Sequence, residues 1–142
     1  MTVIAAPQVV VPGDVLTEAE VAVEDGRITG LQPSAGGRRA DVVLPEGVLV
    51  PGLIDLQING CFGVDFVDAS AKDWEDVAAK LLATGITSFV PTFITAPVGE
   101  LAAALVRAGE ILHRGRLGGA RGLARVLGVH VEGPFLSERR RG

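Results

Sequence analysis

The pattern of hydrophobic and polar positions changes near residue 48. Up to about residue 47, short runs rich in β-branched residues alternate with turn signals. Asp25-Gly26 separates two such runs and predicts a hairpin turn, with Val21 and Val23 sharing one face of the strand before it. A loop is expected at 36–39. This front segment is predicted to form three or four strands of a small sheet, too few to bury a core alone.

From residue 48 onward the pattern predicts strand, helix, strand, helix and strand. Residues 48–59 are apolar until polar residues begin to alternate at the end, as expected of a strand buried on both sides. A helix is predicted to begin at Ser70, which forms a capping-box-like pair with Asp73, and to stop at Gly85. A strand is then expected at 86–95, a helix after Pro97, a loop at 115–122 and a strand at 126–131. The apolar stripes are Trp74, Val77, Ala78, Leu81 and Leu82 in the first helix, and Leu101, Ala104, Leu105, Ala108, Ile111 and Leu112 in the second.

Repeated strand-helix units with apolar strands predict an α/β fold with parallel pairing, for which two architectures come into question. A doubly wound sheet usually carries G-x-G-x-x-G after its first strand, and residues 59–63 do not match that motif. A (β/α)8 TIM barrel is the better interpretation, because polar residues gather at strand ends, where barrel active sites are built. Residues 48–142 would supply its first three β/α units. Closing such a barrel would take roughly 170 to 200 more residues, so the chain is expected to be truncated.

The segment 130–134 carries the most informative chemical signal. Residues two apart on a strand face the same side, so His130 and Glu132 are expected on one face and Val129 and Val131 on the other. A Gly-Pro pair then ends the strand and leaves Glu132 at its C-terminal rim. A carboxylate there is costly unless it is paired or metal-bound, and the residues alone leave both roles open. For His130 they favour a hydrogen-bonded core histidine.

A second polar alternation ends the first predicted strand. Asp55, Gln57 and Asn59 are expected to line up toward the barrel axis. The two amides can hydrogen-bond a water or a substrate carbonyl, but they are poor ligands for zinc. From the residues alone, satisfying backbone groups around the barrel mouth is slightly favoured over a direct role.

Composition limits the classes of function. The chain is 48% apolar and 21% charged, as in soluble globular proteins, and its net charge of −4 gives no nucleic-acid footprint. Cys61 is the single cysteine, which fits a reducing cytosol, and a small buried hydrophobe is favoured over a catalytic thiol. The apolar start lacks a basic region and contains Pro7 and Pro12, and no stretch approaches the roughly 20 apolar residues of a membrane helix. We therefore expect a cytoplasmic protein that binds neither nucleic acid nor membrane.

Three segments resemble N-acetylglucosamine-6-phosphate deacetylases of the amidohydrolase superfamily in order and approximate spacing. They are VPGLIDLQING at 50–60, TGITSFVPT at 84–92 and HVEGPFL at 130–136. Residues 1–47 resemble part of the family's small β-sandwich domain, and 48–142 the N-terminal part of its barrel. The resemblance implies a metal-dependent hydrolase that converts N-acetylglucosamine 6-phosphate to glucosamine 6-phosphate and acetate in amino-sugar metabolism.

The resemblance also implies roles for particular residues. Glu132 matches the family's metal-ligating glutamate, and the metal, zinc or another divalent ion, polarises the amide carbonyl and activates a water. The general-base aspartate and the remaining ligands are expected beyond Gly142, so the chain alone is expected to be inactive. Many amidohydrolases have His-x-His where this chain has Gln57-x-Asn59, so we expect one metal per subunit. The two amides are expected to position water or substrate. His130 is expected to contact a metal ligand rather than the metal itself. The full-length enzyme is expected to be a homodimer.

Two other interpretations stay open. The chain could come from another amidohydrolase acting on a cyclic amide, although most of these are expected to carry the His-x-His pair. It could also be a non-catalytic barrel fragment that serves as an interaction module. Downstream histidines and a late aspartate at strand ends would favour the deacetylase, and a genuine stop codon after the last residue would favour the non-enzyme.

Overall fold

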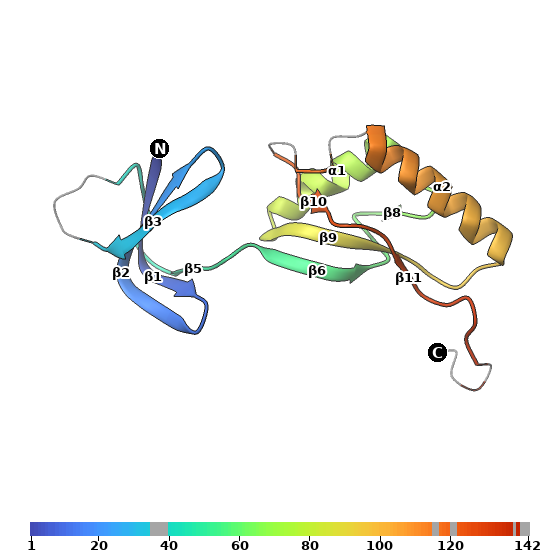
Figure 1. Cartoon of the computed structure of the whole chain (residues 1–142), viewed down its shortest axis with the longest axis horizontal. Helices are drawn as coiled ribbons and strands as arrows, with labels where there is room; N and C mark the ends of the chain where they lie inside the picture. The colour runs from blue at the N-terminus through green and yellow to red at the C-terminus, as the bar shows by residue number, and fades with distance from the viewer. Residues whose placement is uncertain (35–39, 115–116, 120–121, 138, 140–142) are drawn as a thin grey trace. The chain divides into compact units, whose positions relative to one another are not determined.

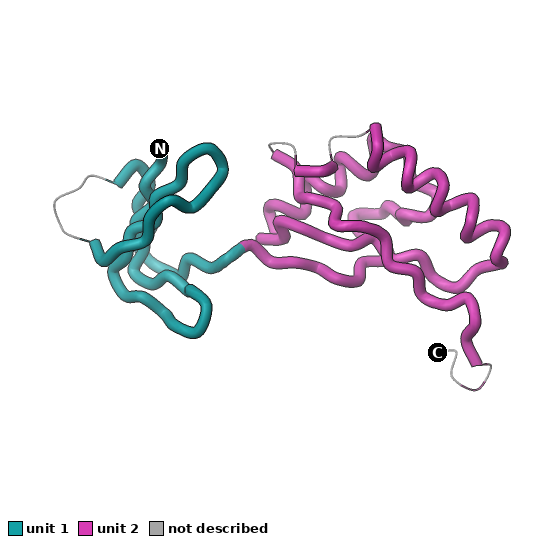
Figure 2. Tube along the Cα trace, in the orientation of Figure 1, with its two compact units in different colours: residues 1–51 teal, residues 52–142 magenta. Residues whose placement is uncertain are grey.

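The computed structural model describes residues 1–34, 40–114, 117–119, 122–137 and 139. It divides the chain into two units, residues 1–51 and 52–142 (Figure 2). The loop predicted at 36–39 lies outside the described residues, as do four positions of the loop predicted at 115–122.

The first unit is a five-stranded sheet in the order β3-β2-β1-β4, with β5 also pairing with β1. Its small core consists of Ala6, Val9, Ala19 and Val21. The predicted turn at Asp25-Gly26 is confirmed: both residues have positive φ, 50° and 74°, as a two-residue hairpin turn between right-twisted strands requires. The strands are β1 (Thr2–Val11), β2 (Asp14–Glu24), β3 (Arg27–Pro33), β4 (Val42–Val43) and β5 (Val48–Leu49).

The prediction of one continuous strand over 48–59 was wrong. Val48 and Leu49 form β5, which pairs with Gln8 and Val9 of β1 in the first unit. Only the later part of the segment, β6 (Leu53–Ile58), joins the second sheet. The Pro-Gly pair at 51–52 separates the two pieces, since proline cannot donate a backbone hydrogen bond to a sheet.

The second unit alternates strands and helices along the sequence, and the strands of its main sheet pair in parallel, as predicted. The central strand β9 (Ile86–Phe93) pairs in parallel with β6 on one side and with β10 (Arg125–Val126) and β11 (His130–Val131) on the other. A short hairpin of β7 (Gly60–Cys61) and β8 (Val64–Asp65) follows β6.

The helices α1 (Ala71–Leu82) and α2 (Val98–Arg114) run along one face of this sheet (Figure 1). The predicted start of α1 is confirmed as a complete capping box: Asp73 N–H donates to the Ser70 hydroxyl, and the Asp73 carboxylate accepts from Ser70 N–H. The two helices bury Trp74, Val77, Ala78 and Leu81 from α1 and Leu101, Ala104 and Ala108 from α2, whereas the predicted core residues Leu82 and Leu105 are exposed.

The third strand differs from the prediction of a single strand over 126–131. From Val126 to His130 the chain advances four positions, while their partners Phe89 and Thr92 on β9 are three positions apart. One extra residue therefore has to be accommodated. Residues 127–129 lie outside both short strands, although the Leu127 backbone N–H still donates to the Phe89 carbonyl at 3.0 Å. Such a mismatch is invisible in the hydrophobic pattern, because it depends on the partner strand.

Candidate active site

Glu132 stands directly after β11, at the C-terminal edge of the parallel strands. Its backbone N–H donates to the carbonyl of Phe93 at the end of β9, with an N···O distance of 2.9 Å. Val129 and Val131 pack against the core beneath the helices. Because neighbours along a strand point to opposite faces, His130 and Glu132 project to the face that the helices leave uncovered, as predicted.

The two side chains differ in burial. Glu132 is half-buried, and none of the salt bridges in the described part of the chain involves it. His130 is exposed in this chain, so the interpretation of a hydrogen-bonded core histidine stays a prediction. The reason is tertiary: a residue on this face of the edge strand β11 is buried only if further chain covers it, and the described residues do not.

The polar residues of β6 lie on the same edge of the sheet but do not share one role. Asp55 is half-buried, and its carboxylate accepts a hydrogen bond of 3.0 Å from the backbone N–H of Gln57. Ile58 is buried in the core beneath the helices, and the pairing of β6 with β9 shifts register between Asp55 and Ile58. Gln57 lies within this irregular stretch, and Asn59 follows just beyond the strand. Both amides are exposed. The structural interpretation thus fits Asp55, whose carboxylate accepts a hydrogen bond from the local backbone, while a role of the two amides toward a ligand stays a prediction.

The sheet therefore brings two predicted segments to one edge without joining their side chains. Gln57 and His130 are on strands that flank β9. Within the described ranges, no hydrogen bond or ion pair links Gln57, Asn59, His130 and Glu132, and no three histidine, cysteine, aspartate or glutamate residues lie close enough to hold a metal ion.

The side chains at these strand ends nevertheless include one that can ligate a divalent cation. Glu132 is an anionic oxygen donor on a rigid strand end, and His130 offers an imidazole two residues before it. Gln57 and Asn59 are neutral amides, which suit a water or a carbonyl better than zinc. A complete cation site would need at least two further donors.

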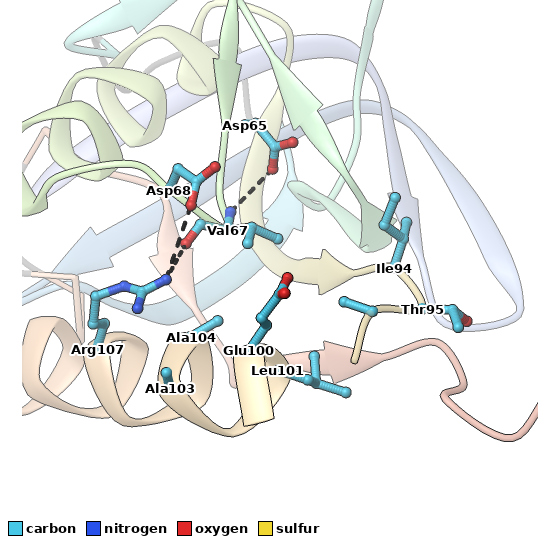
Figure 3. A pocket seen from close by; sticks show the side chains of 11 residues that line it. Asp65, Val67, Asp68, Ile94, Thr95, Glu100, Leu101, Ala103, Ala104 and Arg107 are labelled. Carbon is cyan, nitrogen blue, oxygen red and sulfur yellow. Dashed lines mark hydrogen bonds and ion pairs between the residues drawn. The ribbon is translucent and has the colours of Figure 1, made fainter. Parts of the chain in front are cut away.

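A hollow of about 380 Å³ opens near these strand ends, between α2 and the loops after β8 and β9 (Figure 3). Its charged lining consists of Asp65, Asp68, Glu100 and Arg107. The guanidinium of Arg107 is already engaged, since it donates to the Val67 carbonyl at 3.1 Å and lies 3.9 Å from the Asp68 carboxylate. The surplus of carboxylates disfavours an anionic ligand such as a sugar phosphate. None of the four predicted polar residues lines this hollow.

Cys61 follows β6 on the short β7 strand and packs against the core. Burial raises the pKa of its thiol, and the Asp55 carboxylate raises it further against the opposing effect of Lys80. A thiol with a raised pKa is protonated at neutral pH and a poor nucleophile. This agrees with the prediction of a structural cysteine.

One contact at the strand ends was missed by the sequence analysis. The hydroxyl of Thr95, two residues beyond β9, donates to the backbone carbonyl of Glu132 at 3.0 Å. A threonine after a strand is too common to signal such a contact, because its partner is 37 residues away in sequence.

The chain is similar in sequence to N-acetylglucosamine-6-phosphate deacetylases, which confirms the family resemblance of its motifs. The protein of that name from Mus musculus is 38% identical over 139 residues, covering 92% of this chain and 29% of the relative. The chain therefore spans less than a third of that relative's length. No family model matches it.

Solved structures agree with this relationship. An N-acetylglucosamine-6-phosphate deacetylase from Pasteurella multocida matches with a TM-score of 0.77 and 29% identity, over 99% of this chain and 36% of that structure. An N-acetyl-D-glucosamine-6-phosphate deacetylase from Mycobacterium smegmatis matches with a TM-score of 0.83 over 100% of this chain and 38% of the other, and at 24% identity it supports the fold alone. A D-hydantoinase matches at a TM-score of 0.53 and 19% identity, again evidence of fold only.

Proposed function

We propose that this chain, a relative of N-acetylglucosamine-6-phosphate deacetylases by sequence and fold, supplies the first part of such an enzyme. The reaction would be hydrolysis of the acetamide of N-acetylglucosamine 6-phosphate to glucosamine 6-phosphate and acetate. The observation that carries the proposal is the 38% identity over 92% of the chain to a deacetylase of this name. The D-hydantoinase likeness supports a shared fold only and is no argument for an activity on cyclic amides.

In this proposal residues 52–142 are the first three β/α units of a (β/α)8 barrel, and the front sheet is part of a small β-sandwich domain. The parallel pairing of β6 with β9, and of β9 with β10 and β11, supports it, since consecutive strands of such a barrel are neighbours. The uncovered face of the sheet would then be the barrel interior. Exposed apolar side chains on these strands, such as Leu56 at 68% and Ile54 at 57%, would be covered by the remainder of the barrel.

Glu132 would be one ligand of a single divalent cation, zinc or similar. When bound, such a cation polarises the acetamide carbonyl and makes a water nucleophilic near neutral pH. The chain's own share is to present the Glu132 carboxylate at the strand end, with Gln57 and Asn59 offering amide groups to the acetamide or the water. His130, two residues before Glu132, would support the site. The proton-transferring aspartate, which accepts the water proton and returns it to the leaving amine, would come from outside this chain.

The setting we propose is cytoplasmic, with a homodimer as the working form. A single half-buried cysteine is compatible with a reducing compartment. Across the described ranges, no helix is both long and apolar enough to cross a membrane.

The direct test is Glu132→Gln in a protein of family length that carries this chain. Gln keeps the shape of the side chain and removes its negative charge. We expect metal affinity and kcat to fall together, by more than the roughly 10- to 100-fold that loss of a residue supporting a ligand costs. Glu110→Gln on the exposed side of α2 removes the same charge away from the strand ends and serves as the matched control. Retained metal and near-normal release of glucosamine 6-phosphate in the Glu132 variant would return Glu132 to a structural role.

A further inference from the structure

The backbone of Glu132 is attached to the end of β9 on both sides of its Cα. Its N–H donates to the Phe93 carbonyl at 2.9 Å, and its own carbonyl accepts from the Thr95 hydroxyl at 3.0 Å. The first bond continues the parallel ladder between β11 and β9. The second lies beyond the ladder, because Phe93 is the last residue of β9 and the chain there turns toward α2.

The residue after Glu132 is shaped to admit that second bond. Gly133 has φ of +90°, a conformation that side chains other than glycine rarely adopt. A Cβ at this position would clash with the Thr95 hydroxyl oxygen and lie 3.1 Å from the Thr95 Cβ. Both the conformation and the space therefore require glycine if the Thr95 hydroxyl is to reach the Glu132 carbonyl.

Holding the N–H and the C=O of one residue restricts rotation about both of its backbone bonds. The direction of the Cα–Cβ bond is then set, and only side-chain rotamers remain free. A ligand must be held within about 0.5 Å of its working position, and groups behind it usually provide this restraint. Glu132 is half-buried and has no salt bridge in the described part of the chain, so its backbone attachments are the restraints available to it there.

We propose that Thr95 is a positioning residue for Glu132, acting through the hydrogen bond that Gly133 makes room for. This inference rests on the proposed role of Glu132 as a metal ligand. Thr95 itself touches neither metal nor substrate in this account. Its hydroxyl fixes the last peptide of the third strand to the loop after the second, so that the carboxylate points in one direction before a cation arrives.

The test compares three variants in a protein of family length that carries this chain. Thr95→Val removes the hydroxyl and keeps the shape, and Thr95→Ser restores a hydroxyl. Thr87→Val is the matched control, because Thr87 lies on β9, the strand that Thr95 follows. The Thr87 hydroxyl donates to the Leu53 carbonyl at 3.4 Å, at the opposite end of β9. The measurement is the dissociation constant of zinc, obtained by competition with a chromogenic chelator on the apoprotein. Thr95 and Thr87 are both exposed, so we expect all three variants to fold.

We expect Thr95→Val to weaken zinc binding by about tenfold, the lower end of what losing a supporting partner costs, with Thr95→Ser and Thr87→Val within about threefold of the parent. Unchanged zinc affinity in Thr95→Val, with clear loss in Glu132→Gln, would overturn the positioning role and leave the proposed function intact. Unchanged affinity in Glu132→Gln would instead refute the proposed role of Glu132 as a metal ligand, on which this inference rests. Equal weakening in Thr95→Val and Thr87→Val would mean that the effect is general destabilisation, and this too would refute the positioning role.

Discussion

Replacing Phe89 with alanine should destabilise the second unit more than any exposed substitution. Phe89 lies on the central strand β9, is fully buried, and has its ring centroid 5.7 Å from that of Phe66. Both flanking strands, and with them Glu132, depend on the register of β9. Truncating a fully buried phenylalanine to alanine costs about 3 to 5 kcal/mol, a large share of the roughly 5 to 15 kcal/mol by which ordinary domains are stable.

Trp74 provides the signal for this measurement. It is the one tryptophan of the chain, is fully buried in the second unit, and packs edge-on against Phe66 with ring centroids 5.2 Å apart. Urea unfolding at one protein concentration, followed by its fluorescence, reports on this unit alone. With a urea dependence of about 1.5 kcal/mol/M, the midpoint should fall by roughly 2 to 3 M.

The control is Ile28→Ala, whose side chain is 71% exposed on β3 of the first unit. It should leave the Trp74 transition within about 0.5 kcal/mol of the parent. If Phe89→Ala does not fold at all, Phe89→Leu gives a smaller change that can still be measured. A loss below about 1.5 kcal/mol for Phe89→Ala would show that β9 is not the centre of the core, and the argument from burial would fail.

Three further predictions concern the helix cap, the isolated chain and the metal. Ser70→Ala should cost about 1 kcal/mol of unfolding free energy. Hydrogen bonds from the Ser70 side chain and backbone lower the pKa of Asp73. The carboxylate's contribution to the free energy of unfolding is therefore present above the ordinary aspartate pKa of about 3.9 and is lost as pH falls below it. Urea titrations at several acidic pH values should show that the unfolding free energy of Ser70→Ala depends less on pH. The 142-residue chain by itself should not release glucosamine 6-phosphate above a metal-only blank, and turnover would contradict this. Sedimentation should show self-association through its open sheet edge, and a sharply monomeric species would contradict that. A protein of family length should bind close to one metal per subunit by elemental analysis. The double variant Gln57→His with Asn59→His should raise that ratio toward two, because imidazoles ligate zinc and neutral amides do so poorly. Two tightly held metals in the parent would refute the argument.

Local signals in the sequence were sufficient to predict the elements whose interactions join residues close together in the chain. The capping box of Ser70 and Asp73 and the Asp25-Gly26 turn are settled by residues within a few positions of each other. The helical stripes around Trp74 and Leu101 predicted which faces are buried, since the period of a helix needs no knowledge of its partner. Parallel pairing followed from the alternation of strands with helices, and the motifs identified the family.

Features that depend on a partner far away in sequence were decided only by the tertiary structure. Val48 and Leu49 look like the start of the barrel strand, yet they pair with β1, because hydrophobic pattern does not say which sheet a strand joins. The gap in the third strand arises from a mismatch with β9, and His130 is exposed because nothing in the described chain covers its face. The hydrogen bond from Thr95 to Glu132 spans 37 positions and needs a glycine at 133 in a left-handed conformation. No local pattern encodes such a contact, since it exists only once two strands have been brought side by side.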